Sequence, residues 1–149
     1  MKKEFTTNSA KETYDLAMKI GSLINEGCVI AFKGDLGSGK TCFTTGLAKG
    51  LGYFGEANSP TFAIVNEYLG GRLPIYHFDM YRIADEDELY SIGFYDYLDE
   101  NAVLAIEWSE NIEKELPDDT VFVIFSNQGE NSRLITIECN LDKTFLKEL

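Results

Sequence analysis

The run GDLGSGKT at residues 34–41 has the residue types and spacing of a phosphate-binding loop. It fits G-x-x-x-x-G-K-[ST], the P-loop pattern. Its glycines permit backbone angles and a close approach that a Cβ would block, so that successive N–H groups can converge on phosphate oxygens. Lys40 would reach the β- and γ-phosphates, and the Thr41 hydroxyl would bind Mg²⁺. The run therefore predicts a site for a nucleoside triphosphate with a divalent metal ion, and its glycines are Gly34, Gly37 and Gly39.

The segments on either side of this run supply the strand and the helix that a P-loop requires. CVIAF at residues 28–32 is apolar and β-rich, which is typical of a buried strand. After the run, Phe43, Leu47 and Leu51 recur at helical spacing. A helix that starts at about Lys40 would direct the positive end of its dipole toward the phosphates. The order of strand, glycine loop and helix favours a P-loop over an ordinary glycine-rich turn.

The length and composition indicate a single domain over residues 1–149. The apolar fraction of 44% is enough to form a core. No run approaches the ~20 apolar residues that span a bilayer, and the polar opening lacks the apolar region of a secretory signal. The three cysteines are odd in number and have no metal-ligand spacing, which favours reduced thiols. We therefore expect a cytoplasmic protein with no membrane association.

The net charge of −12 makes the chain a poor independent binder of nucleic acid, because phosphate contacts need clustered Lys and Arg. If the function involves nucleic acid, a partner would hold it. The densest block of charge is DEDE at residues 85–88. We interpret it as the first turn of a helix, where carboxylates suit the dipole, in preference to an acidic docking surface.

The remaining elements follow from periodicity and from turn residues. Ser9 and Glu12 form a capping box, which opens a helix with an apolar stripe that ends at Gly27. Further helices are predicted at residues 85–91 and 141–148, and strands at residues 62–68, 73–79, 102–106, 121–125 and 134–137. The strands at 62–68 and 73–79 form a hairpin. The expected fold is α/β, a P-loop NTPase-like mixed sheet with a parallel core and antiparallel additions, flanked by helices.

A P-loop enzyme also needs an acid at a strand end to hold Mg²⁺ or its water shell, and a group to orient the attacking water. Glu107 follows five apolar residues, and Asp79 ends the predicted strand at 73–79. The composition leaves open which acid binds the metal. Alternation puts Ile75, His77 and Asp79 on one face of their strand. We interpret His77, the single histidine, as structural rather than catalytic.

Three further residues have an alternative structural explanation. Ser59 and Thr61 flank a proline, and Thr61 would suit a switch residue that senses the γ-phosphate, although a simple turn into the next strand explains it equally well. Trp108 directly follows Glu107. Its side chain is interpreted either as buried or as facing a partner. None of the three arginines lies in an evident finger loop, so we expect slow hydrolysis without a partner.

Taken together, these motifs resemble the TsaE family (formerly YjeE), and the resemblance covers nearly the whole chain. It is carried by an ordered set of runs, namely GDLGSGKT at 34–41, SPTF at 59–62, HFDMYR at 77–82, Ile92-Gly93 with Asp96-Tyr97, and IEW at 106–108. The set as a whole is specific, whereas each piece except the P-loop is weak alone.

The resemblance implies a cytoplasmic ATPase that uses ATP and Mg²⁺ and associates with TsaD and TsaB. In such systems TsaD transfers a threonylcarbamoyl group to the adenosine beside the anticodon, and this chain would meet tRNA only through the complex. Lys40, Asp79 and Thr61 then take the catalytic and switch positions, and Thr41 and Glu107 the Mg²⁺ positions. The partner or switch positions are Ser59, Thr61 and Trp108.

By the same resemblance, the phosphate site includes Leu36 and Ser38 and continues to Cys42. The family's adenine pocket matches more loosely, at Ala10 and at residues 129–133, which end in Arg133. Ser38 replaces a common Ala and Cys42 a common Thr, and neither change removes a needed backbone donor. Two alternatives remain: a nucleotide-dependent switch or scaffold with little hydrolysis, and a small-molecule kinase, for which the chain offers little room for a lid and an acceptor pocket.

Overall fold

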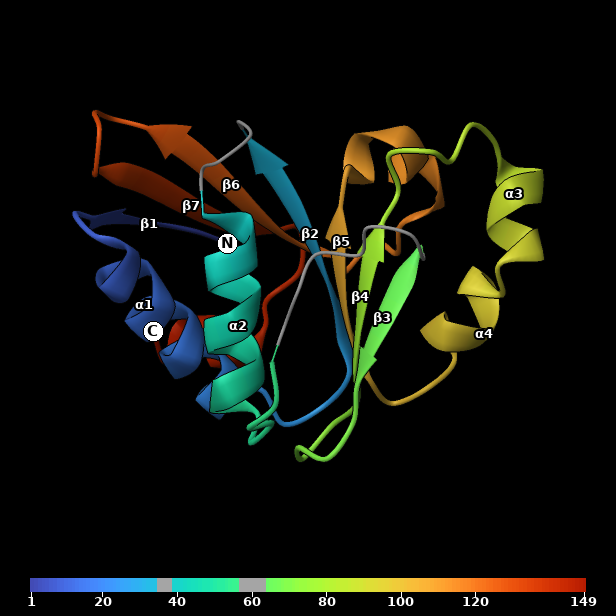
Figure 1. Ribbon diagram of the computed structural model, residues 1–149, viewed down its shortest axis with the longest axis horizontal. Helices are drawn as coiled ribbons and strands as arrows, with labels where there is room; N and C mark the ends of the chain where they lie inside the picture. The colour runs from blue at the N-terminus through green and yellow to red at the C-terminus, as the bar shows by residue number, and fades with distance from the viewer. Residues whose placement is uncertain (35–38, 57–63) are drawn as a thin grey trace.

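The computed structural model describes residues 1–34, 39–56 and 64–149. Within these residues the chain forms a seven-stranded sheet in the order β1-β7-β6-β2-β5-β4-β3 (Figure 1). Strand β2 runs parallel to β5 and β6, and β5 runs parallel to β4. The other three strands, β1, β3 and β7, pair antiparallel with their neighbours. The predicted parallel core with antiparallel additions is confirmed, and its strands are β1 (Lys2–Thr7), β2 (Cys28–Gly34), β3 (Val65–Tyr68), β4 (Ile75–Asp79), β5 (Val103–Glu107), β6 (Val121–Asn127) and β7 (Arg133–Cys139).

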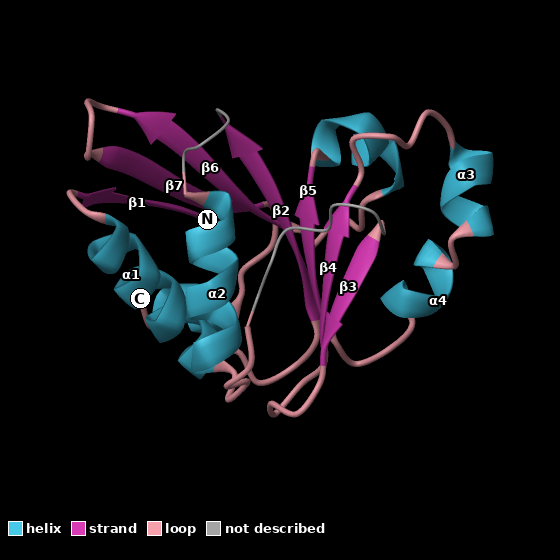
Figure 2. Cartoon of the chain, in the orientation of Figure 1, coloured by secondary structure: helices cyan, strands magenta, loops and turns pink. Residues whose placement is uncertain are grey.

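Helices cover both faces of this sheet (Figure 2). One face carries α1 (Ala10–Leu23), α2 (Lys40–Gly50) and the short α5 (Thr144–Lys147). The other face carries α3 (Glu86–Ser91), α4 (Phe94–Leu98) and the 3₁₀ segment η1 (Ser109–Glu115). A sheet with two apolar faces needs such cover on each side, because both must be removed from water.

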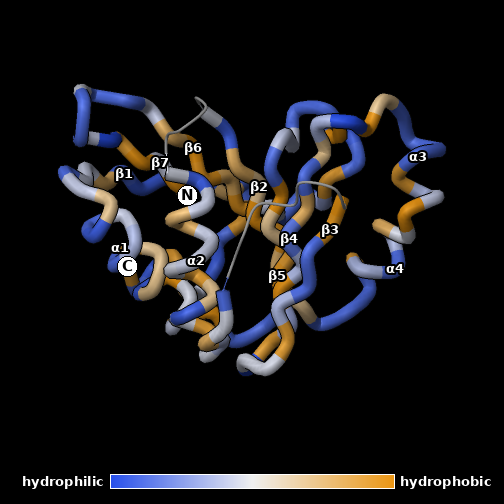
Figure 3. The backbone as a smooth tube through the Cα atoms, in the orientation of Figure 1, coloured by the Kyte–Doolittle hydropathy of each residue, from blue (hydrophilic) through white to orange (hydrophobic). Residues whose placement is uncertain are grey.

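Strand β4 shows how the alternation of side chains divides the core. Ile75 packs in the cluster that includes Phe43 of α2, whereas Tyr76 and Phe78 pack in the cluster that includes Phe94 of α4. The two faces predicted for this strand are therefore confirmed. Figure 3 shows the hydrophobic stretches gathered on the strands and the hydrophilic ones on the outer turns.

Helix α1 begins as the capping box predicts. The Ser9 hydroxyl accepts a hydrogen bond from the backbone N–H of Glu12 at 3.1 Å. The Glu12 carboxylate in turn accepts from the backbone N–H of Asn8 at 3.2 Å, one residue before the cap. Helix α3 starts in the same way, since the Asp85 carboxylate accepts from the backbone N–H of Glu88. The acidic block at residues 85–88 therefore opens a helix, as expected.

Helices α1 and α2 approach each other closely. A Cβ at Gly21 would meet the Leu47 carbonyl oxygen, and one at Gly50 would meet the Met18 carbonyl oxygen. Only glycine leaves room for the two backbones at these points. This contact fixes α2, the helix that follows the P-loop, against the rest of the domain.

The turn between β3 and β4 is tied to the ends of these two helices. The Arg72 guanidinium donates to the carbonyl oxygens of Gly21 at 2.9 Å, Ile24 at 2.9 Å and Gly50 at 3.1 Å. Its backbone N–H donates to the Leu51 carbonyl oxygen at 2.7 Å. One arginine therefore joins the β3–β4 hairpin to the carboxyl ends of α1 and α2.

Several elements differ from the sequence prediction. The chain adds an edge strand, β1, the short α4 and the 3₁₀ segment η1, none of which was predicted. The predicted helix at 141–148 is limited to Thr144–Lys147. The predicted strand at 62–68 is described only from residue 64, and β4 begins at Ile75 rather than at residue 73. Across the described ranges, the structure contains no helix long and apolar enough to cross a membrane.

Candidate nucleotide-binding site

The carboxyl ends of three neighbouring parallel strands meet at one edge of the sheet. Strand β2 ends at Gly34, β5 at Glu107 and β4 at Asp79. In the register of β4 and β5, Asp79 and Glu107 are direct partners. The two acids predicted from separate parts of the chain are thus brought together beside the strand that leads into the P-loop. This edge is where open α/β sheets bind ligands.

The described part of the P-loop has the backbone that the motif requires. Gly34 and Gly39 have φ values of 126° and 109°, which favour glycine. A Cβ at Gly34 would also meet the Phe125 carbonyl oxygen of β6. Helix α2 then begins at Lys40 with Gly39 as its N-cap. Three of the predicted phosphate residues, Leu36, Gly37 and Ser38, lie outside the described residues.

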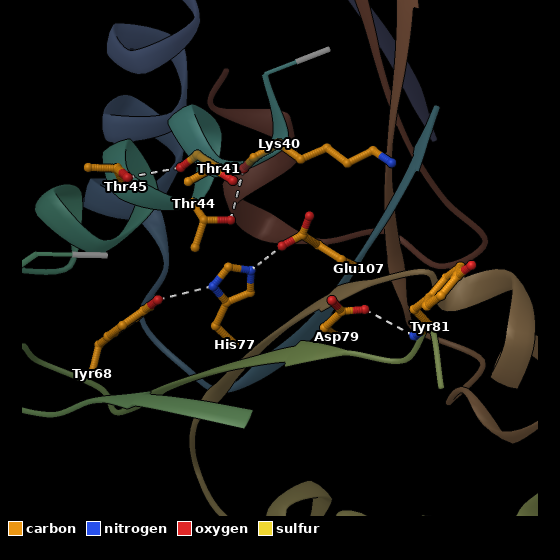
Figure 4. A network of polar contacts seen from close by, with 9 residues as sticks. All are labelled: Lys40, Thr41, Thr44, Thr45, Tyr68, His77, Asp79, Tyr81 and Glu107. Carbon is orange, nitrogen blue, oxygen red and sulfur yellow. Dashed lines mark hydrogen bonds and ion pairs between the residues drawn. The ribbon is translucent and has the colours of Figure 1, made fainter. Parts of the chain in front are cut away.

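Lys40 extends from the first turn of α2 back toward the end of β2. Its Nζ donates to the Gly34 carbonyl oxygen at 2.8 Å and lies 5.9 Å from the centre of the Trp108 ring. Thr41, the next residue, is exposed. In the same turn, the Thr44 and Thr45 hydroxyls donate to the carbonyl oxygens of Lys40 and Thr41 (Figure 4). The Lys40 ammonium group therefore lies at the strand ends, beside the last residue of β2.

Glu107 and Asp79 are held in different ways. His77 Nε2 lies 2.6 Å from Glu107 Oε2, and the Tyr68 hydroxyl lies 3.1 Å from His77 Nδ1 (Figure 4). His77 is fully buried, and the Glu107 side chain is 14% exposed. Asp79 Oδ1 instead accepts from the backbone N–H of Tyr81 at 2.9 Å. His77 is thus built into the structure, as interpreted, but it also contacts a predicted metal acid, which the sequence analysis missed.

Trp108 lies beside this edge in an unusual backbone conformation. Its φ of 59° and ψ of 38° are left-handed, and it alone among the described non-glycine residues has a positive φ. Such a conformation costs an aromatic residue about 1–3 kcal/mol and is concentrated at functional sites. The ring is 38% exposed and lies 4.9 Å from the ring of Tyr81, which is 63% exposed. Trp108 is therefore only partly buried, and Tyr81 beside it is a surface neighbour that sequence reasoning did not single out.

The loosely predicted adenine residues line one small cavity next to Gly39. It has a volume of about 200 Å³. Cys42 Sγ donates to the Ala10 carbonyl oxygen at 3.2 Å within it. Burial raises the pKa of the Cys42 thiol. The cavity is lined by Ser9, Ala10, Thr13, Gly39, Cys42, Asn131 and Arg133. A nucleotide contact at Ala10, Cys42 and Arg133 stays a prediction, but the residues are adjacent. The predicted switch residues Ser59 and Thr61 lie outside the described residues.

The donor set at the strand ends suits Mg²⁺. The candidates, Thr41 and Glu107, offer a hydroxyl and a carboxylate oxygen, and this ion prefers oxygen ligands. Among the described residues there is no cluster of three or more His, Cys, Asp or Glu side chains that could hold a metal ion alone. Mg²⁺ is commonly bound by one or two carboxylates together with substrate phosphates and water. These residues therefore fit a metal that arrives with a nucleotide.

A parallel core whose central strand enters a glycine loop and a helix, with acids on the neighbouring strand ends, defines a P-loop NTPase-like fold. Within that class the chain belongs to the TsaE family. The family model described as "Threonylcarbamoyl adenosine biosynthesis protein TsaE" matches residues 7–135.

Individual relatives agree with this assignment. The chain is 39% identical to a tRNA threonylcarbamoyladenosine biosynthesis protein TsaE from Bacillus subtilis, over 89% of this chain and 83% of the relative. It is also 39% identical to the protein of the same name from Treponema pallidum, over 88% of this chain and 96% of the relative. A crystal structure of Bacillus subtilis YdiB superimposes with a TM-score of 0.78 at 31% identity, covering 99% of this chain and 93% of the other.

Proposed function

We propose that this protein binds ATP with Mg²⁺ at the P-loop and hydrolyses it. This turnover would support threonylcarbamoylation of the adenosine beside the anticodon in tRNA, carried out with a TsaD–TsaB transferase complex. The observation that carries the proposal is the pairing of Asp79 with Glu107 at the strand ends next to β2. Lys40 lies at the same edge, with its Nζ 2.8 Å from the last carbonyl of β2. The names of the relatives supply the pathway.

Each residue would have a distinct part in this reaction. Lys40 would leave the Gly34 carbonyl and bind the β- and γ-phosphates. Thr41 and Glu107 would hold Mg²⁺, which supplies charge neutralisation on the phosphates when bound. Asp79 would orient the attacking water, and Thr61 would sense the γ-phosphate.

Hydrolysis is expected to be slow in the isolated protein. The guanidinium of Arg72 is bonded to the carboxyl ends of α1 and α2. The 11 residues of α2 put it about 16 Å from the start of that helix. It therefore cannot serve as an arginine finger from where it lies. We expect a partner to supply a cation or to order the site, and with a net charge of −12 the protein would meet tRNA only through that partner. Such a complex would be cytoplasmic.

The proposal is tested by measuring ATP turnover with and without purified TsaD and TsaB. We expect slow turnover alone and a marked increase with both partners. Turnover that stays negligible with the partners, while the complex still forms only with ATP, would exclude the ATPase and favour a nucleotide-dependent switch. The absence of both effects would exclude either role.

Point variants test the assignment of the site. Lys40→Ala should strongly lower ATP affinity and turnover, whereas Lys49→Ala, at the other end of the same helix, should leave both near the wild-type values. Glu107→Ala should weaken the dependence of ATP turnover on Mg²⁺ more than Asp79→Ala does. The reverse order would show that Asp79 is the metal acid.

A further inference from the structure

We propose that Tyr68 and His77 are positioning residues that fix the Glu107 carboxylate for Mg²⁺. This inference rests on the proposed function, in which Glu107 is the metal-side acid. It assigns a role to the single histidine of the chain and to a tyrosine on the edge strand β3.

An ionised carboxylate and a neutral imidazole give the two hydrogen bonds one consistent direction. An ionised carboxylate only accepts, so His77 Nε2–H donates to Glu107 Oε2 across 2.6 Å. In a neutral imidazole the other nitrogen then accepts, and the Tyr68 hydroxyl donates to His77 Nδ1 across 3.1 Å. The tyrosine thus selects the tautomer that points a donor at Glu107.

Three adjacent strands bring these side chains together. Tyr68 lies on β3, His77 on β4 and Glu107 on β5. In the register of β4 and β5, His77 faces Ala105 and Asp79 faces Glu107, so the contact from His77 to Glu107 runs diagonally on one face. A shift of either strand by one residue would turn one partner to the opposite face.

The chain of hydrogen bonds lies in a largely buried part of the domain. His77 is 0% exposed, Tyr68 4% and the Glu107 side chain 14%. Buried polar groups cost free energy unless they are paired, and an apolar side chain would fill the place of His77 more simply. A purely structural histidine need not contact the acid at the site. Here the hydrogen-bonded relay from Tyr68 through His77 ends on one oxygen of Glu107. Figure 4 shows the second oxygen directed toward the start of α2, where Lys40 and Thr41 lie.

The relay therefore has a definite consequence for metal binding. One oxygen of Glu107 is held, so the other keeps a constant direction. Hydrogen-bonding partners of metal ligands orient them in this way, and their removal commonly weakens metal affinity about 10–100-fold. We expect His77→Phe, which keeps a ring but removes the donor, to raise the Mg²⁺ concentration at half-saturation about 10-fold. Tyr68→Phe removes only the hydroxyl and should raise it severalfold.

The experiment titrates Mg²⁺ into the protein with a non-hydrolysable ATP analogue. The readout is the fluorescence of Trp108, which is the single tryptophan and follows Glu107 directly. His77→Gln is the rescue variant, because its amide nitrogen can take the place of Nε2 and donate to Glu107. It should bind Mg²⁺ nearly as the wild type does. If His77→Phe matches the wild type, or if His77→Gln is as weak as His77→Phe, the proposed positioning role is wrong.

Controls separate positioning from general damage. Tyr95→Phe removes a comparable hydroxyl, which donates to Glu115 at 3.0 Å on the other face of the sheet, and should leave the Mg²⁺ midpoint unchanged. Binding of the analogue in EDTA should be the same in all variants, since the relay acts on the metal. A wild-type protein that shows no Mg²⁺-dependent response to the analogue would refute the proposed function itself. A normal wild-type response with unchanged variants would refute only the relay.

Discussion

Replacing Arg72 by methionine should lower the stability of the domain more than its exposed position suggests. The side chain joins the β3–β4 turn to the carboxyl ends of two helices, which present unpaired carbonyl groups and the negative end of the helix dipole. Methionine keeps much of the length and apolar stem of arginine. It removes the charge and every donor, so the change isolates the hydrogen bonds.

The structure sets the size of this effect. Two of the bonds, to the Gly21 and Ile24 carbonyl oxygens, are 2.9 Å long and partly buried. The other two, to the carbonyl oxygens of Gly50 at 3.1 Å and Ser22 at 3.5 Å, are exposed, and water can replace them. Hydrogen bonds to charged groups contribute about 1.5–3 kcal/mol each, and we take the lower half of that range for a solvent-exposed arginine. For the two partly buried bonds the expected loss is about 3–4.5 kcal/mol, equivalent to a decrease in Tm of about 6–18 °C for a domain of this size.

The assay is thermal or urea denaturation followed by circular dichroism. Arg72→Lys should fall between the wild type and Arg72→Met, because one ammonium group cannot reach all of the carbonyls. Arg82→Met removes the same charge from another exposed side chain and serves as the control. A change of less than 1 °C in Arg72→Met, or an equal loss in Arg82→Met, would refute the role of Arg72 as a shared cap.

Three other outcomes follow from local contacts. Alkylation of the half-buried Cys42, followed by mass spectrometry, should slow severalfold when ATP and Mg²⁺ are bound. Cys28 is buried and its pKa is raised to about 12, so it should stay unmodified. An unchanged alkylation rate at Cys42 would put the nucleotide elsewhere. Gly46→Ala should lower Tm despite the better helix propensity of alanine, because its Cβ would meet a carbonyl oxygen of α1. Burial and the Glu100 hydrogen bond raise the pKa of Tyr76 from 10.0 to about 12, so this tyrosine ionises first in the unfolded chain as pH rises. The free energy of unfolding, measured by urea titration, should therefore fall between pH 10 and 12. The fall should be smaller in Tyr76→Phe.

The sequence predicted the elements with strong local signals and missed those that depend on the rest of the sheet. The P-loop helix and the capped α1 follow from spacing and caps, and both form as expected. Strand β1 has the sequence KKEFTT, and its charged residues obscure the alternation of more and less exposed side chains that it adopts beside β7. The same limit applies to His77 and Glu107. Their contact spans 30 residues of sequence and requires β5 to lie between β2 and β4, which is not their order along the chain.

The two acids that the sequence left equivalent differ in how the structure holds them, and this difference bears on their chemistry. The Glu107 side chain is 14% exposed, and one of its oxygens is bonded to a buried imidazole, which limits the directions that the carboxylate can take. Asp79, which has the same intermediate burial, is bonded to the backbone N–H of Tyr81 in the turn that follows β4. A metal with strict octahedral geometry gains most from a ligand whose direction is fixed in advance. A carboxylate beside a turn retains access to solvent, from which an attacking water must come. The hydrogen bonds that hold the two side chains therefore favour Glu107 as the Mg²⁺ ligand and Asp79 as the group that orients the attacking water. The Mg²⁺ dependence of ATP turnover in their alanine variants decides between this assignment and its reverse.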